Sequence, residues 1–127
     1  MHSENYFIRT FRTQWADCDN VTVSLFARDD PETQIGIVEL KLYKQASIYP
    51  GTAYIWNLWV EEAYRRQLHG QRLLTEALQI VRQYGYHTAE LDWDVRDSPR
   101  WVLLWYERQG FRIEKFSKTY VLLKMEI

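Results

Sequence analysis

The hydrophobic pattern changes its period once, close to residue 60, and this change constrains the fold more than any other feature. Before it, aromatic and β-branched residues predict strands over four segments, residues 6–15, 21–28, 34–43 and 52–60. After it, apolar residues recur at helical spacing, at Leu73, Leu74, Ala77, Leu78 and Val81. This spacing predicts a helix from His69 to Tyr84, ended by Gly85.

The remaining residues predict a strand, a second helix and two final strands. Residues 88–95 alternate between apolar and acidic side chains, which is typical of a strand with one polar face. Residues 98–99, a Ser-Pro pair, predict an N-cap followed by proline in the first turn of a helix that Gly110 ends. Residues 111–127 predict two short strands that turn near Ser117.

Turn-forming residues at 17–20 and 29–32 separate the first three predicted strands. The order is therefore four strands, a helix, a strand, a helix and two strands. It predicts one α+β domain over residues 1–127, with a mixed, mostly antiparallel sheet and two main helices rather than a doubly wound parallel sheet.

Composition excludes several classes of protein. Hydrophobic residues make up 46% and charged residues 26%, which excludes a disordered chain, and a net charge of -1 argues against a nucleic-acid partner. The N-terminal stretch, residues 1–5, lacks the features of a signal peptide, and no apolar run reaches the roughly 20 residues that span a membrane.

One cysteine, Cys18, cannot form an internal disulfide, and no His and Cys spacing suggests a metal site. We expect a cytoplasmic protein without a membrane partner.

A basic loop lies between the fourth predicted strand and the first predicted helix. The strand ends in Leu58-Trp59-Val60, and residues 65–72 follow at the start of the helix. Unpaired N–H groups and the positive end of the helix dipole favour an anion such as a pyrophosphate at this point. A solvated basic turn is an equally simple interpretation of this segment alone.

Three short motifs, in order, resemble the GNAT superfamily of N-acetyltransferases. Arg65, Leu68 and Gly70 occupy the positions of the superfamily's motif A, Arg/Gln-x-x-Gly-x-Gly/Ala. Residues 105–111, Trp-Tyr-Glu-Arg-Gln-Gly-Phe, resemble its later aromatic and Gly-Phe signature, and Ile35-Gly36 resembles the apolar-Gly pair of its third strand. The resemblance covers roughly residues 20–127 and implies a GNAT-like acyl-CoA N-acyltransferase fold.

The resemblance implies acetyl-CoA as the co-substrate and an amine as the acceptor, with no metal. Backbone groups of the strand end would bind the pantetheine arm, and amides of the basic loop would surround the pyrophosphate. The implied cofactor-binding residues are Leu58, Trp59, Val60, Arg65, Arg66, Gln67, Leu68, His69, Gly70, Gln71 and Arg72. The side chain of His69 is expected to donate a hydrogen bond or to face solvent.

Tyr106 matches the position of the superfamily's usual general acid, a phenol that protonates the departing CoA thiolate. An ordinary core aromatic is the alternative role for this residue. The general base stays open among four carboxylates on plausible elements, Glu61, Glu62, Asp92 and Asp94, each of which could equally be a surface residue.

The sequence departs from the superfamily in three places. Ser98 or Pro99 stands where many members have an asparagine that touches the cofactor arm. Leu68 stands where the first glycine is usual, and its side chain restricts the backbone of the loop. A tight turn at residues 17–20 replaces the two helices that usually build one wall of the acceptor site. That wall is therefore either truncated or completed by another chain, as in a homodimer. These departures also leave open a CoA-binding sensor without turnover, or an interaction protein that uses its aromatic residues as an interface.

Overall fold

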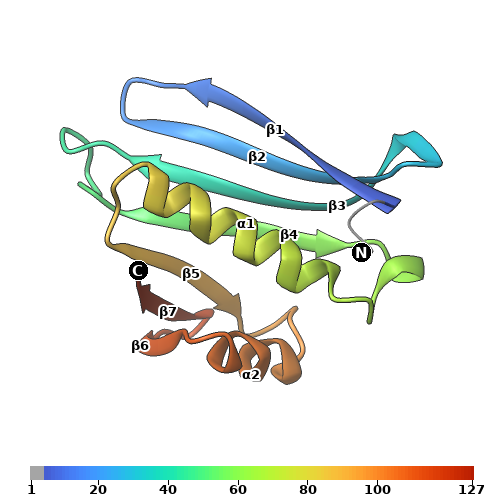
Figure 1. Ribbon diagram of the computed structural model, residues 1–127. Coiled ribbons are helices and arrows are strands. Elements are labelled where there is room, and N and C mark those ends of the chain that lie inside the picture. Colours follow the sequence, from blue (N-terminus) through green and yellow to red (C-terminus); the bar gives the residue numbers. More distant parts are fainter. Residues whose placement is uncertain (1–4) are drawn as a thin grey trace.

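The computed structural model describes residues 5–127, which form one seven-stranded sheet with two α-helices and a short 3₁₀-helix (Figure 1). The first four residues, part of the N-terminal stretch discussed above, lie outside this range. The elements in chain order are β1 (Tyr6–Gln14), β2 (Cys18–Ala27), β3 (Asp30–Tyr43), β4 (Ala53–Val60), η2 (Glu62–Tyr64), α1 (His69–Gln83), β5 (Thr88–Asp94), α2 (Arg100–Arg108), β6 (Arg112–Phe116) and β7 (Tyr120–Glu126).

The strands lie in the order β1-β2-β3-β4-β5-β7-β6. Neighbouring strands are antiparallel except β4 and β5, which are parallel and are joined by the crossover through α1. The predicted order of strands and helices and the mixed, mostly antiparallel sheet are confirmed. Neither helix in the described range is both long and apolar enough to cross a membrane.

The first two turns differ from the sequence prediction. The chain reverses over residues 15–17, where the Trp15 N–H donates to the Cys18 carbonyl at 2.9 Å, so Cys18 and Asp19 belong to β2. Asp19 is buried, and its carboxylate contacts Arg12 at 3.2 Å and Lys44 at 3.7 Å. These partners stabilise a turn-forming residue inside a strand. The second turn is also shorter than predicted, because β3 already begins at Asp30.

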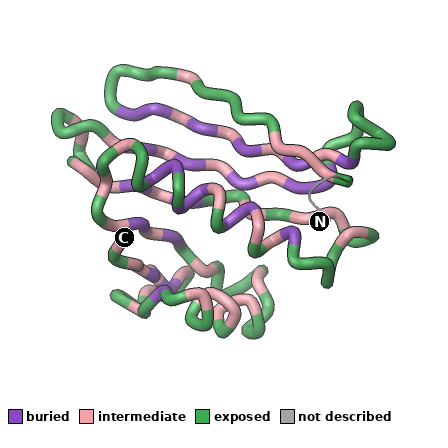
Figure 2. Tube along the Cα trace, in the orientation of Figure 1, coloured by how far each residue is buried: buried purple, intermediate pink, exposed green. Residues whose placement is uncertain are grey.

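Helix α1 covers one face of the central strands. Its apolar side packs on the inward-facing residues of β2 and β3, and the most buried side chains include Val23, Leu25, Val38, Leu40, Leu73, Leu74, Ala77 and Val81. Gly36 allows this close approach, because a Cβ there would lie 3.0 Å from Leu73 Cδ1 and 3.3 Å from the Trp59 carbonyl oxygen. Burial alternates from residue to residue along these strands, and along α1 the buried residues recur every three to four positions (Figure 2).

Both helices end at the glycines that the sequence indicated. After α1, Gly85 has φ +84°, its N–H donates to the Arg82 carbonyl, and the Tyr86 N–H donates to the Val81 carbonyl. This pair of bonds is a Schellman motif, which requires the left-handed conformation that glycine adopts easily. The start of α2 differs from the prediction, because the helix begins at Arg100 and Pro99 occupies the N-cap position without a side-chain cap.

The other face of β1 to β4 has no helix across it in the described part of the chain. The contacts between α1 and the sheet run from β2 to β5, and the link between β1 and β2 is too short to hold a helix. Aromatic side chains lie on this open face: Phe7 stacks on Phe26 at 5.4 Å, and Trp56 and Trp59 are 38% and 42% exposed. The predicted loss of the N-terminal helices is confirmed, and it leaves this face accessible.

Candidate active site

Strands β4 and β5 pair over two residues only and then separate. Their register contains Ala53 opposite Ala89 and Tyr54 opposite Glu90, and no later pair. On its other edge, β4 contains a bulge, marked by a register shift against β3 and by Asn57 at φ +55°. A bulge bends the strand and increases its twist, which turns the end of β4 away from β5. Sequence patterns gave no signal for this bulge.

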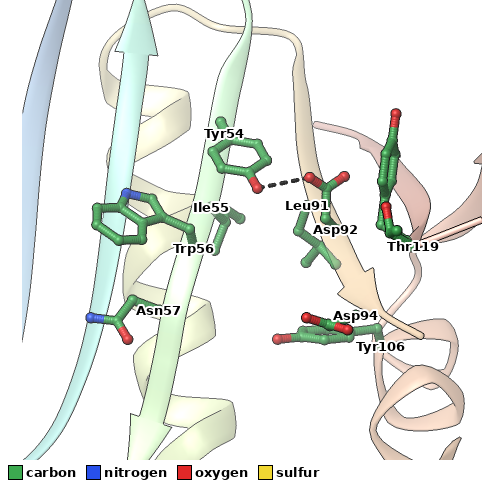
Figure 3. Close-up of a pocket in the computed structure, with 10 residues that line it drawn as sticks. Tyr54, Ile55, Trp56, Asn57, Leu91, Asp92, Asp94, Tyr106 and Thr119 are labelled. Carbon is green, nitrogen blue, oxygen red and sulfur yellow. Dashed lines mark hydrogen bonds between the residues drawn. The ribbon is translucent and has the colours of Figure 1, made fainter. Parts of the chain in front are cut away.

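A cavity of about 390 Å³ lies between the separated strands (Figure 3). Residues from β4, β5, α2 and the β6–β7 turn region surround it, namely Tyr54, Ile55, Trp56, Asn57, Leu91, Asp92, Asp94, Tyr106, Thr119 and Tyr120. At one end the Tyr54 hydroxyl donates to Asp92 Oδ2 at 2.9 Å and so spans the two strands. Burial and the Asp92 carboxylate raise the pKa of Tyr54, so its hydroxyl stays protonated at neutral pH.

Two of the four carboxylates that the sequence left open as a base line this cavity. Asp92 and Asp94 are alternate residues of β5 and so share one face of the strand. Asp94 Oδ1 accepts the N–H groups of Arg96 at 2.8 Å and Asp97 at 3.1 Å. Glu61 and Glu62 follow the end of β4 and do not line the cavity.

Tyr106 reaches the same cavity from α2. Its ring packs edge to face on Trp105 and Phe111, at 5.3 Å and 6.0 Å between centroids. Its hydroxyl points from α2 toward β4 (Figure 3). Burial raises the pKa of Tyr106 to about 12, so the group is a proton donor at neutral pH. The two roles considered for Tyr106 are therefore compatible: the ring packs in the core, and the hydroxyl faces the cavity.

The basic loop is tied to the end of β4. The Arg65 Nε–H donates to the Val60 carbonyl at 2.8 Å, so this consensus arginine fixes the strand end. Arg66 and Leu68 both have left-handed backbones, with φ +63° and +66°. Leu68 thus adopts the conformation that glycine adopts most easily, and its side chain is 74% exposed to solvent.

The first turn of α1 presents backbone N–H groups that no side chain caps in the described chain. Arg72 is the first residue of the helix whose N–H is bonded back, to the Leu68 carbonyl at 3.0 Å. The amides of His69, Gly70 and Gln71 precede it and have no intrahelical partner. With the helix dipole, they form a site suited to an anion. The edge of β4 that faces β5, at Leu58, Trp59 and Val60, is likewise free of strand partners.

The side chain of His69 does not face solvent, which corrects the expectation from sequence. It is 5% exposed and lies edge to face on Tyr6 at 4.4 Å and near Tyr64 at 6.4 Å. Its Nε2 atom has no hydrogen-bond partner among the described residues, and burial together with the Arg72 charge lowers its pKa. His69 thus offers an anion its backbone N–H, and its neutral ring anchors the loop to β1.

Residues 5–127 contain no group of three or more His, Cys, Asp or Glu side chains that could hold a metal ion.

Comparison with known proteins identifies the family. The model of the Acetyltransferase (GNAT) family matches residues 2–111. The chain therefore belongs to the GNAT family of acetyltransferases. No curated protein matches the sequence significantly.

Several solved structures share the fold. PaiA N-acetyltransferase from Thermoplasma acidophilum, in complex with coenzyme A, is 22% identical with a TM-score of 0.71; the match covers 85% of this chain and 61% of that one. A GNAT family acetyltransferase from Elizabethkingia anophelis with acetyl-CoA bound is 16% identical with a TM-score of 0.73, covering 98% and 99%. IAA acetyltransferase from Bacillus cereus is 24% identical with a TM-score of 0.67, covering 85% and 78%. The chain thus spans about three fifths of the PaiA protein and nearly all of the Elizabethkingia protein.

Proposed function

We propose that this protein is an N-acetyltransferase that transfers an acetyl group from acetyl-CoA to a primary amine by direct attack. The observation that carries this proposal is the position of Tyr106: its hydroxyl faces a cavity where β4 and β5 separate, and the same β4 leads to the free amides of α1. The two structural relatives with CoA or acetyl-CoA bound support the choice of co-substrate.

Helix α1 and strand β4 would bind different parts of acetyl-CoA. The N–H groups of residues 69–71, together with the basic residues Arg66 and Arg72, would bind the pyrophosphate. The unpaired edge of β4 at residues 58–60 would bind the pantetheine amides and offer an N–H to the thioester oxygen. This arrangement directs the thioester into the cavity, toward Tyr106.

Transfer then needs three proton movements, the last of which restores the two protein groups. The amine nitrogen attacks the thioester carbonyl carbon, and the resulting tetrahedral intermediate loses a proton from nitrogen to a carboxylate of the cavity. When the C–S bond breaks, the Tyr106 hydroxyl donates its proton to the thiolate. The carboxylic acid returns its proton to the tyrosinate, directly or through water, and the products are the amide and CoA thiol.

Two measurements test the proposal. Acetyl-CoA at a hundredfold excess over its dissociation constant should stabilise the fold by about 2.7 kcal/mol, a rise of several degrees in Tm. A panel of amines with acetyl-CoA should release free thiol faster than acetyl-CoA alone. Cys18 is buried and burial raises its pKa, so it should add little to the thiol signal. Binding without release would instead indicate a CoA sensor, and an unchanged Tm would contradict the proposal altogether.

A further inference from the structure

The basic loop holds two of the three non-glycine residues that have positive φ in the described part of the chain. Arg66 has φ +63°, and Leu68, which occupies the N-cap position of α1, has φ +66°. This backbone conformation is unfavourable for a residue with a Cβ, so it persists only where the surrounding structure holds it. The Leu68 side chain is 74% exposed and contributes little of that support.

Hydrogen bonds already described fix the two ends of the basic loop. The Arg65 side chain donates to the Val60 carbonyl at the end of β4, and the Arg72 N–H donates to the Leu68 carbonyl in the first turn of α1. Neither bond determines the backbone between them, at residues 66–67. The path of the loop therefore depends on a further contact.

Tyr6, the first residue of β1, supplies this contact on both sides of Leu68. Its ring lies edge to face on the His69 ring at 4.4 Å, and its hydroxyl donates to Gln67 Oε1 at 3.4 Å. The buried His69 Nε2 has no hydrogen-bond partner within residues 5–127, so aromatic packing orients the imidazole. Figure 1 shows β1 and α1 starting at the same end of the sheet.

The pairing of β1 with β2 fixes the backbone of Tyr6. Tyr6 lies opposite Ala27 in the register, and the next pair is closed by the Arg28 N–H, which donates to the Asn5 carbonyl at 2.9 Å. The Tyr6 side chain also packs against the hydrophobic core. A residue that is already ordered in this way can support a loop at little further cost in conformational entropy.

We propose that Tyr6 is a positioning residue for the coenzyme, which holds the basic loop in the path that directs the amides of residues 69–71 toward the pyrophosphate. The proposal rests on the acetyl-CoA binding proposed above. Tyr6 acts through His69 and Gln67 and takes no part in bond making. Donors that are ordered before the ligand arrives bind it more tightly, because binding no longer bears the cost of ordering them.

Replacement of Tyr6 tests this role. Tyr6→Ala removes both contacts and should weaken CoA binding about tenfold, the upper end of what an aromatic pair contributes. Tyr6→Phe keeps the ring and should stay within about threefold of the wild type, because the hydroxyl bond is long and exposed. Calorimetry with CoA measures both. With a competent amine, Tyr6→Ala should raise KM for acetyl-CoA and leave kcat at saturation nearly unchanged.

Ile8→Ala is the matched control for lost packing. Ile8 lies two residues along β1, on the same face as Tyr6, and packs against the same core. Its replacement should lower Tm and leave CoA affinity within about threefold of the wild type. Tyr6→Leu keeps apolar volume without the aromatic contact and gives the same test as Tyr6→Ala if the alanine variant does not fold.

A second readout needs no coenzyme. The Arg72 N–H closes the first turn of α1 on the Leu68 carbonyl, so its hydrogen exchange reports whether the loop keeps its path. Without CoA, exchange at Arg72 should be about tenfold faster in Tyr6→Ala and unchanged in Ile8→Ala.

The two readouts separate this inference from the proposed function. Unchanged exchange and unchanged CoA affinity in Tyr6→Ala would overturn the inference and leave CoA binding standing. An equal loss of affinity in Ile8→Ala would also overturn it, because general destabilisation would explain both, and an equal loss in Tyr6→Phe would contradict the role of the ring. If the wild type binds no CoA, the proposed function fails, and exchange at Arg72 alone decides whether Tyr6 holds the loop.

Discussion

The rings of Tyr106 and Phe111 meet edge to face, 6.0 Å apart between centroids, across the C-terminal turn of α2. The turn is a second Schellman motif, in which the Gly110 N–H donates to the Glu107 carbonyl at 3.0 Å and the Phe111 N–H donates to the Tyr106 carbonyl at 3.2 Å. Phe111 is buried, so the motif fixes the last turn of α2 to the core. The Gly-Phe pair therefore determines where the Tyr106 hydroxyl enters the cavity.

Gly110→Ala should destabilise the protein by about 1–2 kcal/mol, because a side chain is strained at positive φ. Gly110 has φ +109°, and a Cβ there would lie 3.0 Å from Met125 Cε. Gly70→Ala is the matched control, since a Cβ at Gly70 would have no atom within 4 Å. Urea unfolding of both variants measures the difference. Equal stability of the two variants would show that the turn is not strained.

Tyr106→Phe should lower kcat about a hundredfold to ten-thousandfold, nearer the lower value because a thiolate leaves readily. The affinity for acetyl-CoA should stay within a few fold, since the lost proton transfer acts in the transition state. With a pKa of about 12, the Tyr106 hydroxyl should remain protonated through pH 10, so its titration should cause no loss of rate below that pH. Steady-state kinetics with a competent amine measures both quantities.

The control for that substitution is Tyr84→Phe, which removes a hydroxyl outside the cavity lining. If kcat of Tyr106→Phe and kcat of Tyr84→Phe both stay above a third of the wild-type value, Tyr106 is a packing residue. The Tm of both variants shows whether the ring of Tyr106 still packs.

Leu68→Gly should raise the free energy of unfolding by up to about 1 kcal/mol, because relief of left-handed strain outweighs the greater freedom of glycine in the unfolded chain. The exposed side chain of Leu68 contributes little packing that could be lost. Acetyl-CoA affinity should be equal or tighter, since the loop keeps its backbone path. Calorimetry that shows tenfold weaker binding would mean that the leucine itself contacts the cofactor.

Acid should destabilise the fold through His69. Burial and Arg72 lower the pKa of His69 in the folded state below its ordinary value of 6.5, so the unfolded chain binds more protons. The contribution of His69 to stability is complete above pH 6.5 and is lost as the pH falls below it. Urea unfolding at pH 7.5 and pH 5.0 should show a larger loss for the wild type than for His69→Phe, which does not titrate. Identical losses would exclude His69 as the source.

The open face of the sheet should associate with a second copy of the chain. Trp56 and Trp59 are 38% and 42% exposed on this face, where Phe7 also stacks on Phe26, and exposed aromatic side chains are costly to leave in water. Light scattering at about 100 times assay concentration should report a dimer, and Trp59→Ser should shift the mass toward the monomer. A wild-type monomer at that concentration would remove this prediction.

The sequence predicts the order of elements because each carries a local signal. The helical spacing of α1 and the two helix-ending glycines depend on neighbouring residues alone, and these predictions are confirmed. The predicted turn at Cys18 and Asp19 is wrong, because the ion pairs that the buried Asp19 forms with the exposed Arg12 and Lys44 override the turn preference of aspartate. Those partners are remote in sequence, so no local pattern reveals them.

The sequence predicts less of the candidate site than of the order of helices and strands. Resemblance to the GNAT family indicated Tyr106 and the loop before α1, but the cavity depends on the bulge at Asn57 and on how far β4 pairs with β5. The sequence left four carboxylates as equal candidates for the general base, and the pairing of β5 in the sheet places two of them, Asp92 and Asp94, beside the cavity. Pairing between strands decides both features, and it is a property of the whole sheet.

The three-residue link between β1 and β2 bears on how this protein would choose among acceptors. A wall of helices selects partly by excluding molecules that are too large. Within one copy of the chain, no helix of the described residues covers this face of the sheet, so an acceptor would reach the cavity across it unless a second copy lies there, and the part of the acceptor behind its amine would meet little obstruction. Discrimination then depends on the chemistry of the tip that enters the cavity, and an aminoalkyl group at the end of a large molecule could enter as readily as a small free amine.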